Sequence, residues 1–463
     1  MATLHVKVED SHFAIDKVLL SENCEYFHAL FESGMRECQQ EEIHLLGLSA
    51  KGFDIVLKVL GGKRPALDCD EIIEAIECAA FLQVKSLVKH LINLVNSNNC
   101  IEMYHAASTY GLLDLYHRCA LFIRDMYSDL KEALECLPVD LLDYIDSLVP
   151  STFIAVGAYS PTFVQDSLRS VCYLDEDSKT WKTLTDLPAE ASTALAGVTV
   201  LDNKLYIVGG VYGVSKQAVE LSFCYDPERN TWSHFSSPQQ LRYNLTLMGH
   251  NGYLYAIGGE YDRRIISSVE RYHVSTDTWS FVSPLPRPAA GAACAQAMGR
   301  MFVCLWKPID TTDIYEYDPD RDQWLLITTL IRPQSYGHYM VAHRDNLYVM
   351  RNGPSDDFLR CMIDCFNITT LQWTVMAGQY VNSKGALFTS AVKGDSVFTV
   401  NRMLTLVYSV EEKMWKPKKE MQGYRWCGSL LTCFLRLPKT SSDDLSTDCI
   451  IHTGQQEPED IKT

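Results

Sequence analysis

The sequence predicts a multidomain chain in which an α+β domain and a short all-α segment precede an all-β, six-bladed propeller. Six tryptophans recur along the last two-thirds of the chain, at intervals from 42 residues (Trp373 to Trp415) to 51 residues (Trp181 to Trp232). Another aromatic residue precedes each tryptophan by seven or eight positions. One unit repeated six times indicates stacked sheets, because a single unit cannot bury its own apolar face. The aromatic pairs are Tyr173–Trp181, Tyr225–Trp232, Tyr272–Trp279, Tyr317–Trp324, Phe366–Trp373 and Tyr408–Trp415.

A short apolar strand lies upstream of each aromatic pair, at 153–158, 205–210, 254–259, 301–306, 347–352 and 397–402. Two of these strands end in Gly–Gly, which suits a crowded inner rim because glycine has no Cβ atom. The other four have lost one or both glycines, and two of them carry arginine instead, Arg351 and Arg402. The first unit lacks a first strand, so we expect residues 428–438 to supply it and leave no open edge.

The first third of the chain has a different pattern. Residues 4–8 alternate between apolar and polar, as a half-buried strand does, and apolar residues then recur at helical spacing in several segments up to Leu148. We expect the boundary near Val149–Pro150. The last residues, 439–463, are polar and acidic, and we expect them to be disordered because they cannot bury enough apolar surface.

Composition excludes several classes of function. The chain has 463 residues and a net charge of −17, which argues against binding to nucleic acid or an anionic membrane. Its beginning, MATLHVKVED, has no features of a secretory signal, and its sixteen scattered cysteines are typical of reduced thiols, so we expect a cytoplasmic protein. No phosphate-binding loop, GxSxG or HExxH motif is present, and we expect no cofactor, no metal and no catalysis.

Three stretches of the first third, residues 13–37, 43–60 and 75–87, resemble a BTB (POZ) domain. Residues 97–149 resemble a shortened form of the BACK segment that follows such domains, and the tryptophan interval is close to the ~50-residue kelch repeat. The whole chain thus resembles the BTB-kelch family. The expected domains are BTB at 1–93, BACK at 94–149, a six-bladed kelch propeller at 150–438 and the acidic tail at 439–463.

Two departures from the family pattern concern the oligomeric state. The family's Ala-His-Arg is replaced by Ala14-Ile15-Asp16-Lys17, and the leading helix and strand that such domains exchange are missing. We therefore expect a monomer or a weak homodimer.

The resemblance implies that the first third binds cullin-3. Met35 and Glu37 match the hydrophobic-x-acidic triplet that contacts this scaffold in the family, and Tyr104 and Tyr110 would contribute from the helices that follow. The alternative is that Met35 only fills a local apolar gap.

The resemblance also implies that one face of the propeller binds a protein substrate. The loops at this face supply arginines interleaved with tyrosines, which favours an acidic segment because guanidinium matches carboxylate in a bidentate manner. The alternative is that individual arginines are paired internally, with Asp262, Asp356, Asp357 or backbone carbonyls. The residues expected at the face are Arg242, Tyr243, Tyr261, Arg263, Arg264, Arg332, Tyr336, His338, Arg351, Lys384, Arg402 and Arg425, with Tyr212 and Tyr424 beside them.

The leading functional hypothesis is a non-catalytic substrate adaptor of a cullin-3 RING ubiquitin ligase. The alternative is a structural protein that binds actin filaments through the propeller, and a cytoskeletal substrate would be compatible with both. A BTB transcription factor fits poorly, because the chain is acidic and has no zinc fingers.

Overall fold

The computed structural model divides the chain into two compact units, Met1–Pro150 and Ser151–Thr463, and each is described by itself. The structure describes residues 3–34, 40–157, 170–175, 177–178, 180–188, 195–212, 217–307, 311–331, 336–352, 360–376, 380–381, 389–400, 404–410, 412–420, 430–438 and 450–452.

The first unit begins with a three-stranded sheet in the order β2-β1-β3. Strand β1 pairs antiparallel with β2 and parallel with β3. Its alternating sequence buries Leu4, Val6 and Val8 against the helices, as a period of two requires. The strands are β1 (Thr3–Val8), β2 (Ser11–Asp16) and β3 (Glu42–Leu45).

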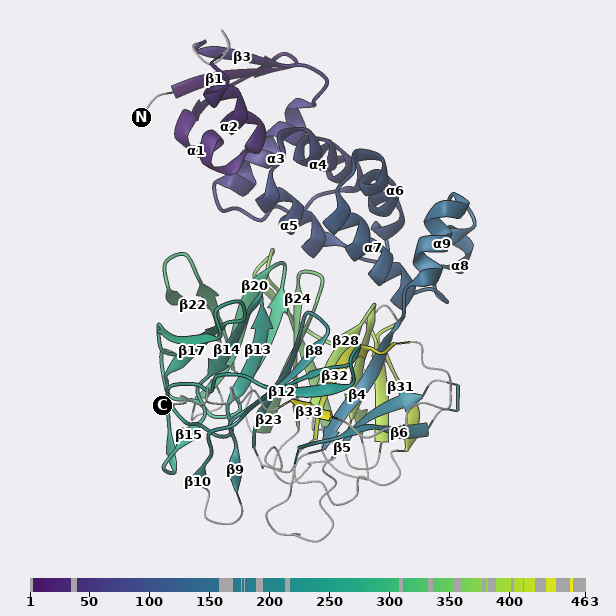
Figure 1. The fold of residues 1–463 in the computed structure, drawn as a ribbon, viewed down its shortest axis with the longest axis vertical. Helices are drawn as coiled ribbons and strands as arrows, with labels where there is room; N and C mark the ends of the chain where they lie inside the picture. Colours follow the sequence, from purple (N-terminus) through teal and green to yellow (C-terminus); the bar gives the residue numbers. More distant parts are fainter. Residues whose placement is uncertain are drawn as a thin grey trace, which may run out of the picture. The chain divides into compact units, whose positions relative to one another are not determined.

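Helices form the rest of the first unit (Figure 1). Ser49 caps α3 by accepting from the backbone of Gly52, and Asp68 begins α4 with a capping box that it shares with Glu71. Among the described residues, no helix has the length and apolar character needed to cross a membrane. The helices are α1 (Lys17–Asn23), α2 (Glu25–Glu32), α3 (Ala50–Leu60), α4 (Cys69–Leu82), α5 (Lys85–Leu94), α6 (Cys100–Tyr110), α7 (Leu113–Asp125), α8 (Lys131–Leu134) and α9 (Val139–Ser147).

The second unit consists of sheets in which four strands are hydrogen-bonded in a row, each antiparallel to its neighbour. Each sheet is named here by the first strand of that row. The described residues form six such sheets, with short hairpins β9–β10 and β15–β16 between strands and β27 beside β25. The β32 sheet contains β32 (Leu430–Arg436), β4 (Ser151–Gly157), β5 (Ser170–Asp175) and β6 (Thr180–Asp186); the β7 sheet contains β7 (Gly197–Leu201), β8 (Lys204–Val208), β11 (Ser222–Asp226) and β12 (Thr231–His234); the β13 sheet contains β13 (Thr246–His250), β14 (Tyr253–Ile257), β17 (Val269–His273) and β18 (Thr278–Val282).

The remaining three sheets follow the same path along the chain. The β19 sheet contains β19 (Ala293–Ala297), β20 (Arg300–Lys307), β21 (Thr311–Asp318) and β22 (Gln323–Ile331); the β23 sheet contains β23 (Tyr336–His343), β24 (Asn346–Asn352), β25 (Arg360–Asn367) and β26 (Gln372–Val375); the β28 sheet contains β28 (Thr389–Lys393), β29 (Ser396–Val400), β30 (Leu404–Ser409) and β31 (Met414–Glu420). The prediction of a helical α+β region followed by an all-β region is confirmed.

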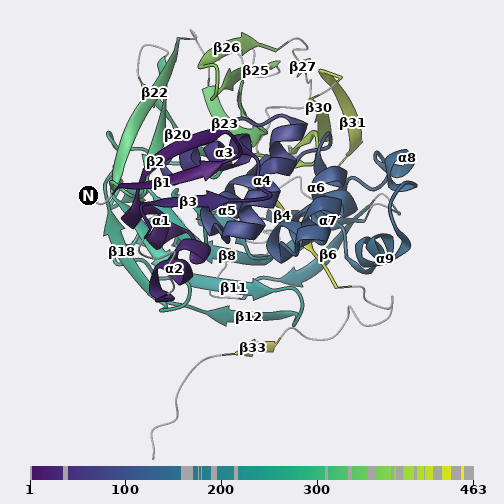
Figure 2. The same ribbon diagram turned by 90° about the horizontal axis from the view of Figure 1, so that it is seen from above.

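The first strands of the sheets lie against one another in sequence. Strand β7 contacts β13, β13 contacts β19, β19 contacts β23, β23 contacts β28, β28 contacts β32 and β32 contacts β7. The last strands, among them β12, β22, β26 and β31, lie toward the periphery in Figure 2. The C-terminal β32 pairs antiparallel with β4 along its whole length, from Leu430 opposite Gly157 to Arg436 opposite Ser151.

A second segment from the C-terminal end also joins a sheet. Strand β33 (Ile450–His452) pairs in parallel with β12, so the outer edge of the β7 sheet carries a fifth strand. The other residues of the expected disordered tail, 439–449 and 453–463, lie outside the described residues.

The recurring aromatic pairs hold neighbouring sheets together. In five of the six pairs the two rings pack 4.9–5.1 Å apart between centroids, as Tyr317 and Trp324 do at 4.9 Å and Phe366 and Trp373 at 5.1 Å. Four of the indole nitrogens donate to the preceding sheet or its loop, which satisfies the polar atom of a large ring. These bonds are Trp232 Nε1 to Thr185 Oγ1 (3.3 Å), Trp279 Nε1 to the Ser236 carbonyl (2.6 Å), Trp324 Nε1 to the Ser283 carbonyl (2.9 Å) and Trp373 Nε1 to Thr328 Oγ1 (2.9 Å).

Candidate partner-binding surfaces

Tyr104, one of the residues expected to contact cullin-3, lies inside the first unit. Its side chain is fully buried on α6, and its hydroxyl lies 2.9 Å from Tyr116 Oη and 2.9 Å from the Leu141 carbonyl oxygen. Burial raises the pKa of Tyr104, and the hydrogen bond with Tyr116 adds to this effect. The residue therefore joins helices α6, α7 and α9 and offers no surface to a partner.

Tyr104 is the first of three stacked tyrosines. Its ring lies 4.6 Å from the ring of Tyr116, and Tyr116 lies 4.9 Å from Tyr144 of α9. The Tyr144 hydroxyl is also 2.7 Å from His117 Nδ1. The stack fixes the last helix of the unit to the two helices before it.

Tyr110, the other expected residue, is 40 % exposed at the end of α6. Its hydroxyl donates to the carboxylate of Glu77 on α4, and this hydrogen bond is the main reason why the pKa of Tyr110 is raised. Two further apolar side chains with large exposed fractions lie near this junction, Phe81 at 45 % on α4 and Leu113 at 76 % at the start of α7. Together Phe81, Tyr110 and Leu113 form what we call the helical strip.

The helical strip continues to helix α2. The ring of Tyr26 on α2 lies 5.1 Å from the ring of Phe81. Helix α2 ends at Glu32, shortly before Met35–Gln39, and both Met35 and Glu37 lie outside the described residues. Sequence reasoning missed Phe81 and Leu113, because an apolar residue in a helical pattern is usually assigned to the core.

The expected substrate face belongs to the second unit. Neighbouring strands of a sheet are antiparallel, so the loops that lead into each first strand and the connections between second and third strands lie at the same end. Tyr261, Arg263 and Arg264 lie in the β15–β16 connection (Glu260–Tyr261 and Arg264–Ile265), and all three are exposed. The structure thus brings three of the expected residues together on one hairpin.

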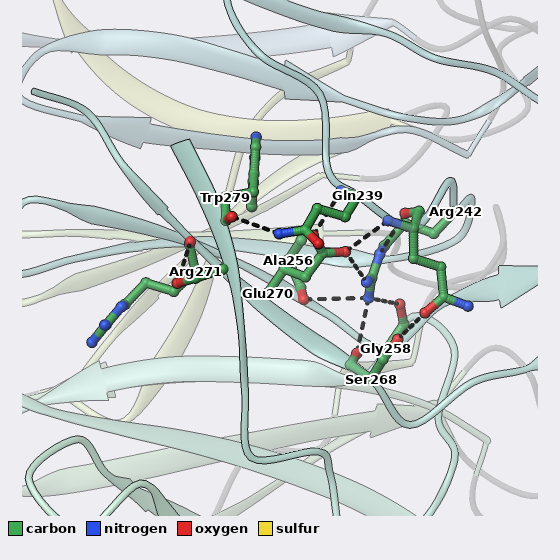
Figure 3. A network of polar contacts seen from close by, with 10 residues as sticks. Gln239, Arg242, Ala256, Gly258, Ser268, Glu270, Arg271 and Trp279 are labelled. Atoms are coloured by element: carbon green, nitrogen blue, oxygen red, sulfur yellow. Dashed lines mark hydrogen bonds and ion pairs between the residues drawn. The ribbon is translucent and has the colours of Figure 1, made fainter. Parts of the chain in front are cut away.

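Arg242 lies in the loop that leads into the β13 sheet, and its side chain is completely buried (Figure 3). The guanidinium donates from Nη2 to Glu270 Oε1 at 2.6 Å, and from Nη1 to the carbonyl oxygens of Gly258 at 3.0 Å and Ser268 at 2.8 Å. Burial lowers the pKa of Arg242, and Glu270 opposes that effect. The internal-pairing alternative therefore holds for Arg242, and this residue is removed from the substrate face.

The Glu270 carboxylate accepts two further bonds from the loop that carries Arg242. The backbone nitrogens of Gln239 and Gln240 donate to it at 2.7 Å and 3.1 Å, as Figure 3 shows in part. Carboxylate and guanidinium thus satisfy each other and the surrounding backbone, as a buried ion pair requires. The network fixes the path of the loop across the end of the sheet.

Arg351 is the second arginine that is paired internally. It is 7 % exposed, and its Nε donates to Asp364 Oδ2 at 2.8 Å. The expectation that Arg351 lies on the substrate face is therefore also wrong, because its guanidinium is buried against a carboxylate of the same sheet. The described acidic partners of Arg242 and Arg351 are Glu270 and Asp364, and Arg242 also binds backbone carbonyls, as the internal-pairing alternative had it.

The remaining expected residues divide into three groups. Tyr243 is fully buried, and its backbone forms a bridge to Glu260, so its ring is not part of an open face. Tyr336 and His338 lie in β23, and Tyr212 lies in β9. Arg332, Lys384, Arg402, Tyr424 and Arg425 lie outside the described residues, together with Asp356 and Asp357.

Among the described side chains, no group of three or more His, Cys, Asp or Glu residues is placed so that it could hold a metal ion. The described cysteines are free, and most are buried; burial raises the pKa of the Cys24 thiol and of the Cys304 thiol to about 12. These thiols are packing residues.

Comparison with known proteins agrees with the two-part architecture. A BTB/POZ domain family model matches residues 1–99, and a Kelch motif model matches residues 192–239 and 241–286. Kelch repeat and BTB domain-containing protein 13 of Homo sapiens is 54 % identical over 429 residues, which cover 92 % of this chain and 93 % of that protein. Its Mus musculus counterpart is 53 % identical over 96 % of this chain and 97 % of that protein. Kelch-like protein 42 of Homo sapiens is 30 % identical over 89 % of this chain and 92 % of that protein. The chain therefore belongs to the family of proteins that join a BTB domain to kelch repeats.

Proposed function

We propose that this protein is a non-catalytic adaptor of a cullin-3 RING ubiquitin ligase that acts in the cytoplasm. The first unit binds cullin-3, and the second unit binds the protein to be ubiquitinated. The observation that carries the proposal is the helical strip: exposed Phe81, Tyr110 and Leu113 on a BTB unit, beside the helix that leads into the Met35–Glu37 segment. Exposed aromatic and aliphatic side chains of this kind are typical anchors of a protein interface.

In this proposal the second unit is a six-bladed kelch propeller closed by β32. The closed order of contacts between first strands supports a ring, and the pairing of β32 with β4 supports closure by a strand from the C-terminal end. A closed ring leaves only the short outer edges of its sheets open. Such a platform suits a partner-binding role, because its loops are presented on a rigid base.

The proposal also assigns helices α6 to α9 to a short BACK segment. The tyrosine stack supports a rigid segment, because it joins α6, α7 and α9 through two ring contacts. Rigidity matters for the mechanism. An adaptor accelerates ubiquitin transfer by raising the effective concentration of substrate beside the ligase, and that concentration depends on how well the spacing is defined.

The test is a binding titration of full-length protein with cullin-3. Replacing Leu113 with Asp and Phe81 with Ala should weaken binding at least tenfold, because a buried anchor often contributes ~2 kcal/mol or more. A matched control is Leu46→Asp, which changes another apolar side chain with a large exposed fraction, 83 %, in the loop after β3. The control should leave the affinity unchanged. Equal affinities for both variants would remove the helical strip from the interface.

A further inference from the structure

We propose that the β15–β16 hairpin and the adjacent end of the β19 sheet form a preformed docking surface for an extended acidic peptide that carries one large apolar side chain. The inference rests on the proposed function, because it names the partner chemistry of the second unit. Its residues are Tyr261, Arg263, Arg264, Lys307 and Ile331.

The hairpin is held in one conformation. Asp262 and Arg263 form its two-residue turn with φ of 49° and 61°, and two consecutive positive φ angles match the twist of a tight hairpin. At the base, the Glu260 and Tyr243 backbones exchange hydrogen bonds of 2.7 and 3.0 Å, and Asn244 Nδ2 donates to Glu260 Oε1 at 2.9 Å. A partner would therefore meet the turn already ordered, which lowers the entropic cost of binding.

The two arginines of the hairpin differ from three other described arginines at this end of the unit. Arg242, Arg287 and Arg351 each form an ion pair with a carboxylate of their own sheet. Arg263 and Arg264 are exposed and form no ion pair with any residue in the described part of the chain. In a protein with a net charge of −17, two adjacent guanidinium groups without an internal acid point to a carboxylate supplied from outside.

Apolar groups accompany these charges. Tyr261 lies opposite Arg264 on the same face of the hairpin and is 45 % exposed. The neighbouring β19 sheet has longer strands than the β13 sheet, with eight residues in β20 against five in β14. The β19 sheet therefore extends further than the β13 sheet at the end of the unit where the hairpin lies.

The side of the β19 sheet that faces the hairpin follows from strand alternation. Leu305 packs with Tyr255 and Ile257 of the β13 sheet, so Lys307, two residues further, points to the same side. Lys307 lies opposite Thr311, and Thr311 lies opposite Ile331, which is 66 % exposed. A cation and an aliphatic side chain thus stand on the side toward the hairpin.

One loop fixes the hairpin and the sheet end to each other. The Ala289 carbonyl accepts from the Gly259 nitrogen at 2.8 Å, and the Ala289 nitrogen donates to the Ile266 carbonyl at 3.2 Å, both at the hairpin base. Two residues earlier, Arg287 Nη1 lies 2.9 Å from Asp313 Oδ2 in the β19 sheet. The two halves of the surface are therefore parts of one connected structure.

The experiment is selection of a phage-displayed library of random peptides on full-length protein, followed by fluorescence anisotropy titration of a synthetic selected peptide. We expect selected peptides to carry at least two Asp or Glu residues near a large apolar side chain. The variant Arg263→Glu with Arg264→Glu should weaken binding at least tenfold, Ile331→Asp should weaken it several-fold, and added salt should weaken binding to the unmodified chain. Arg263→Lys with Arg264→Lys keeps the charge and should retain part of the affinity.

Arg229→Glu is the matched control, because Arg229 is an exposed arginine in the β11–β12 turn, at the opposite end of the strands. It should leave peptide binding unchanged. Selection of peptides without acidic residues, equal binding by the Arg263→Glu/Arg264→Glu variant, or displacement of the peptide by a single-stranded oligothymidylate would each overturn the proposal. A titration of the Arg263→Glu/Arg264→Glu variant with cullin-3 separates this proposal from the proposed adaptor function. Cullin-3 binding should persist in this variant, although peptide binding is weakened.

Discussion

Arg351 Nε donates to Asp364 Oδ2 over 2.8 Å in the β23 sheet, and Asp364 occupies the position that Glu270 has in the β13 sheet. Each carboxylate lies two residues before the aromatic member of its repeat, Phe366 or Tyr272, and each is fully buried. Glu270 receives its guanidinium from a leading loop, whereas Asp364 receives one from the strand end where the β13 sheet has Gly258. The loss of glycine at this position is thus accompanied by a buried ion pair.

We expect Arg351→Met to lower the free energy of unfolding of the second unit by about 3–5 kcal/mol, because it removes the guanidinium that compensates the charge of a buried carboxylate. All eight tryptophans lie after residue 150, so tryptophan fluorescence during urea unfolding reports this unit. Adding Asp364→Leu should restore part of the loss. Arg264→Met, at an exposed position, is the control and should have little effect. An Arg351→Met protein as stable as the control would show that the pair contributes nothing.

The second prediction concerns pH. His250 is buried at the end of β13, and burial lowers its pKa, against a smaller opposite effect of Gln296. In the unfolded chain His250 therefore takes up a proton near pH 6.5, whereas in the folded unit His250 takes up a proton only at lower pH. Since the unfolded state binds more protons in that interval, the contribution of His250 to stability falls as pH decreases below about 6.5.

We expect His250→Gln to reduce the loss of stability between pH 7.5 and pH 5.5, measured by urea unfolding followed with tryptophan fluorescence. His234→Gln is the control, because His234 is an exposed histidine on β12 of the same unit. An identical pH profile for the His250→Gln and unmodified proteins would mean that His250 is not buried in its neutral form.

The third prediction concerns the tyrosine stack. Tyr116→Ala removes the middle ring between Tyr104 and Tyr144, and loss of a large packed aromatic side chain costs about 3–5 kcal/mol when it is buried; Tyr116 is only partly buried, so the lower end applies. Hydrogen exchange should accelerate in α9 more than in α6, because α6 keeps its other buried contacts. Val139→Ala, at an exposed position of α9, is the control. Uniform exchange across both helices would show that the stack does not hold α9 in place.

The repeated aromatic pairs allowed the sheets to be predicted from the sequence, because their spacing and the apolar strands before them depend only on local order. The family resemblance put the β15–β16 arginines on the expected face together with Arg242 and Arg351, and it could not tell exposed arginines from buried ones. Whether an arginine is buried depends on a carboxylate far away in the chain, as Glu270 is from Arg242, and on the strand register that brings the two together. Tyr104 was misplaced for a similar reason, since its partners Tyr116 and Leu141 belong to other helices.

The last prediction concerns the C-terminal strand. Strand β32 pairs with β4, and its residues also enter two apolar clusters: Leu435 packs with Ile154 and Leu205, while Phe434 packs with Phe153. A chain that ends after Trp415 loses this strand, exposes the edge of β4 and opens the contacts of β32 with both β28 and β7.

We expect that truncated chain to unfold at a markedly lower urea concentration and to aggregate, whereas a chain that ends at Lys439 should unfold like the full-length protein. The second truncation also removes β33, so it is the control for the strand on the outer edge of β12. Because β33 pairs along three residues and β32 along seven, most of the stabilisation should come from β32. If the chain ending at Trp415 unfolded at the same urea concentration as the full-length protein, the second unit would have to close without β32.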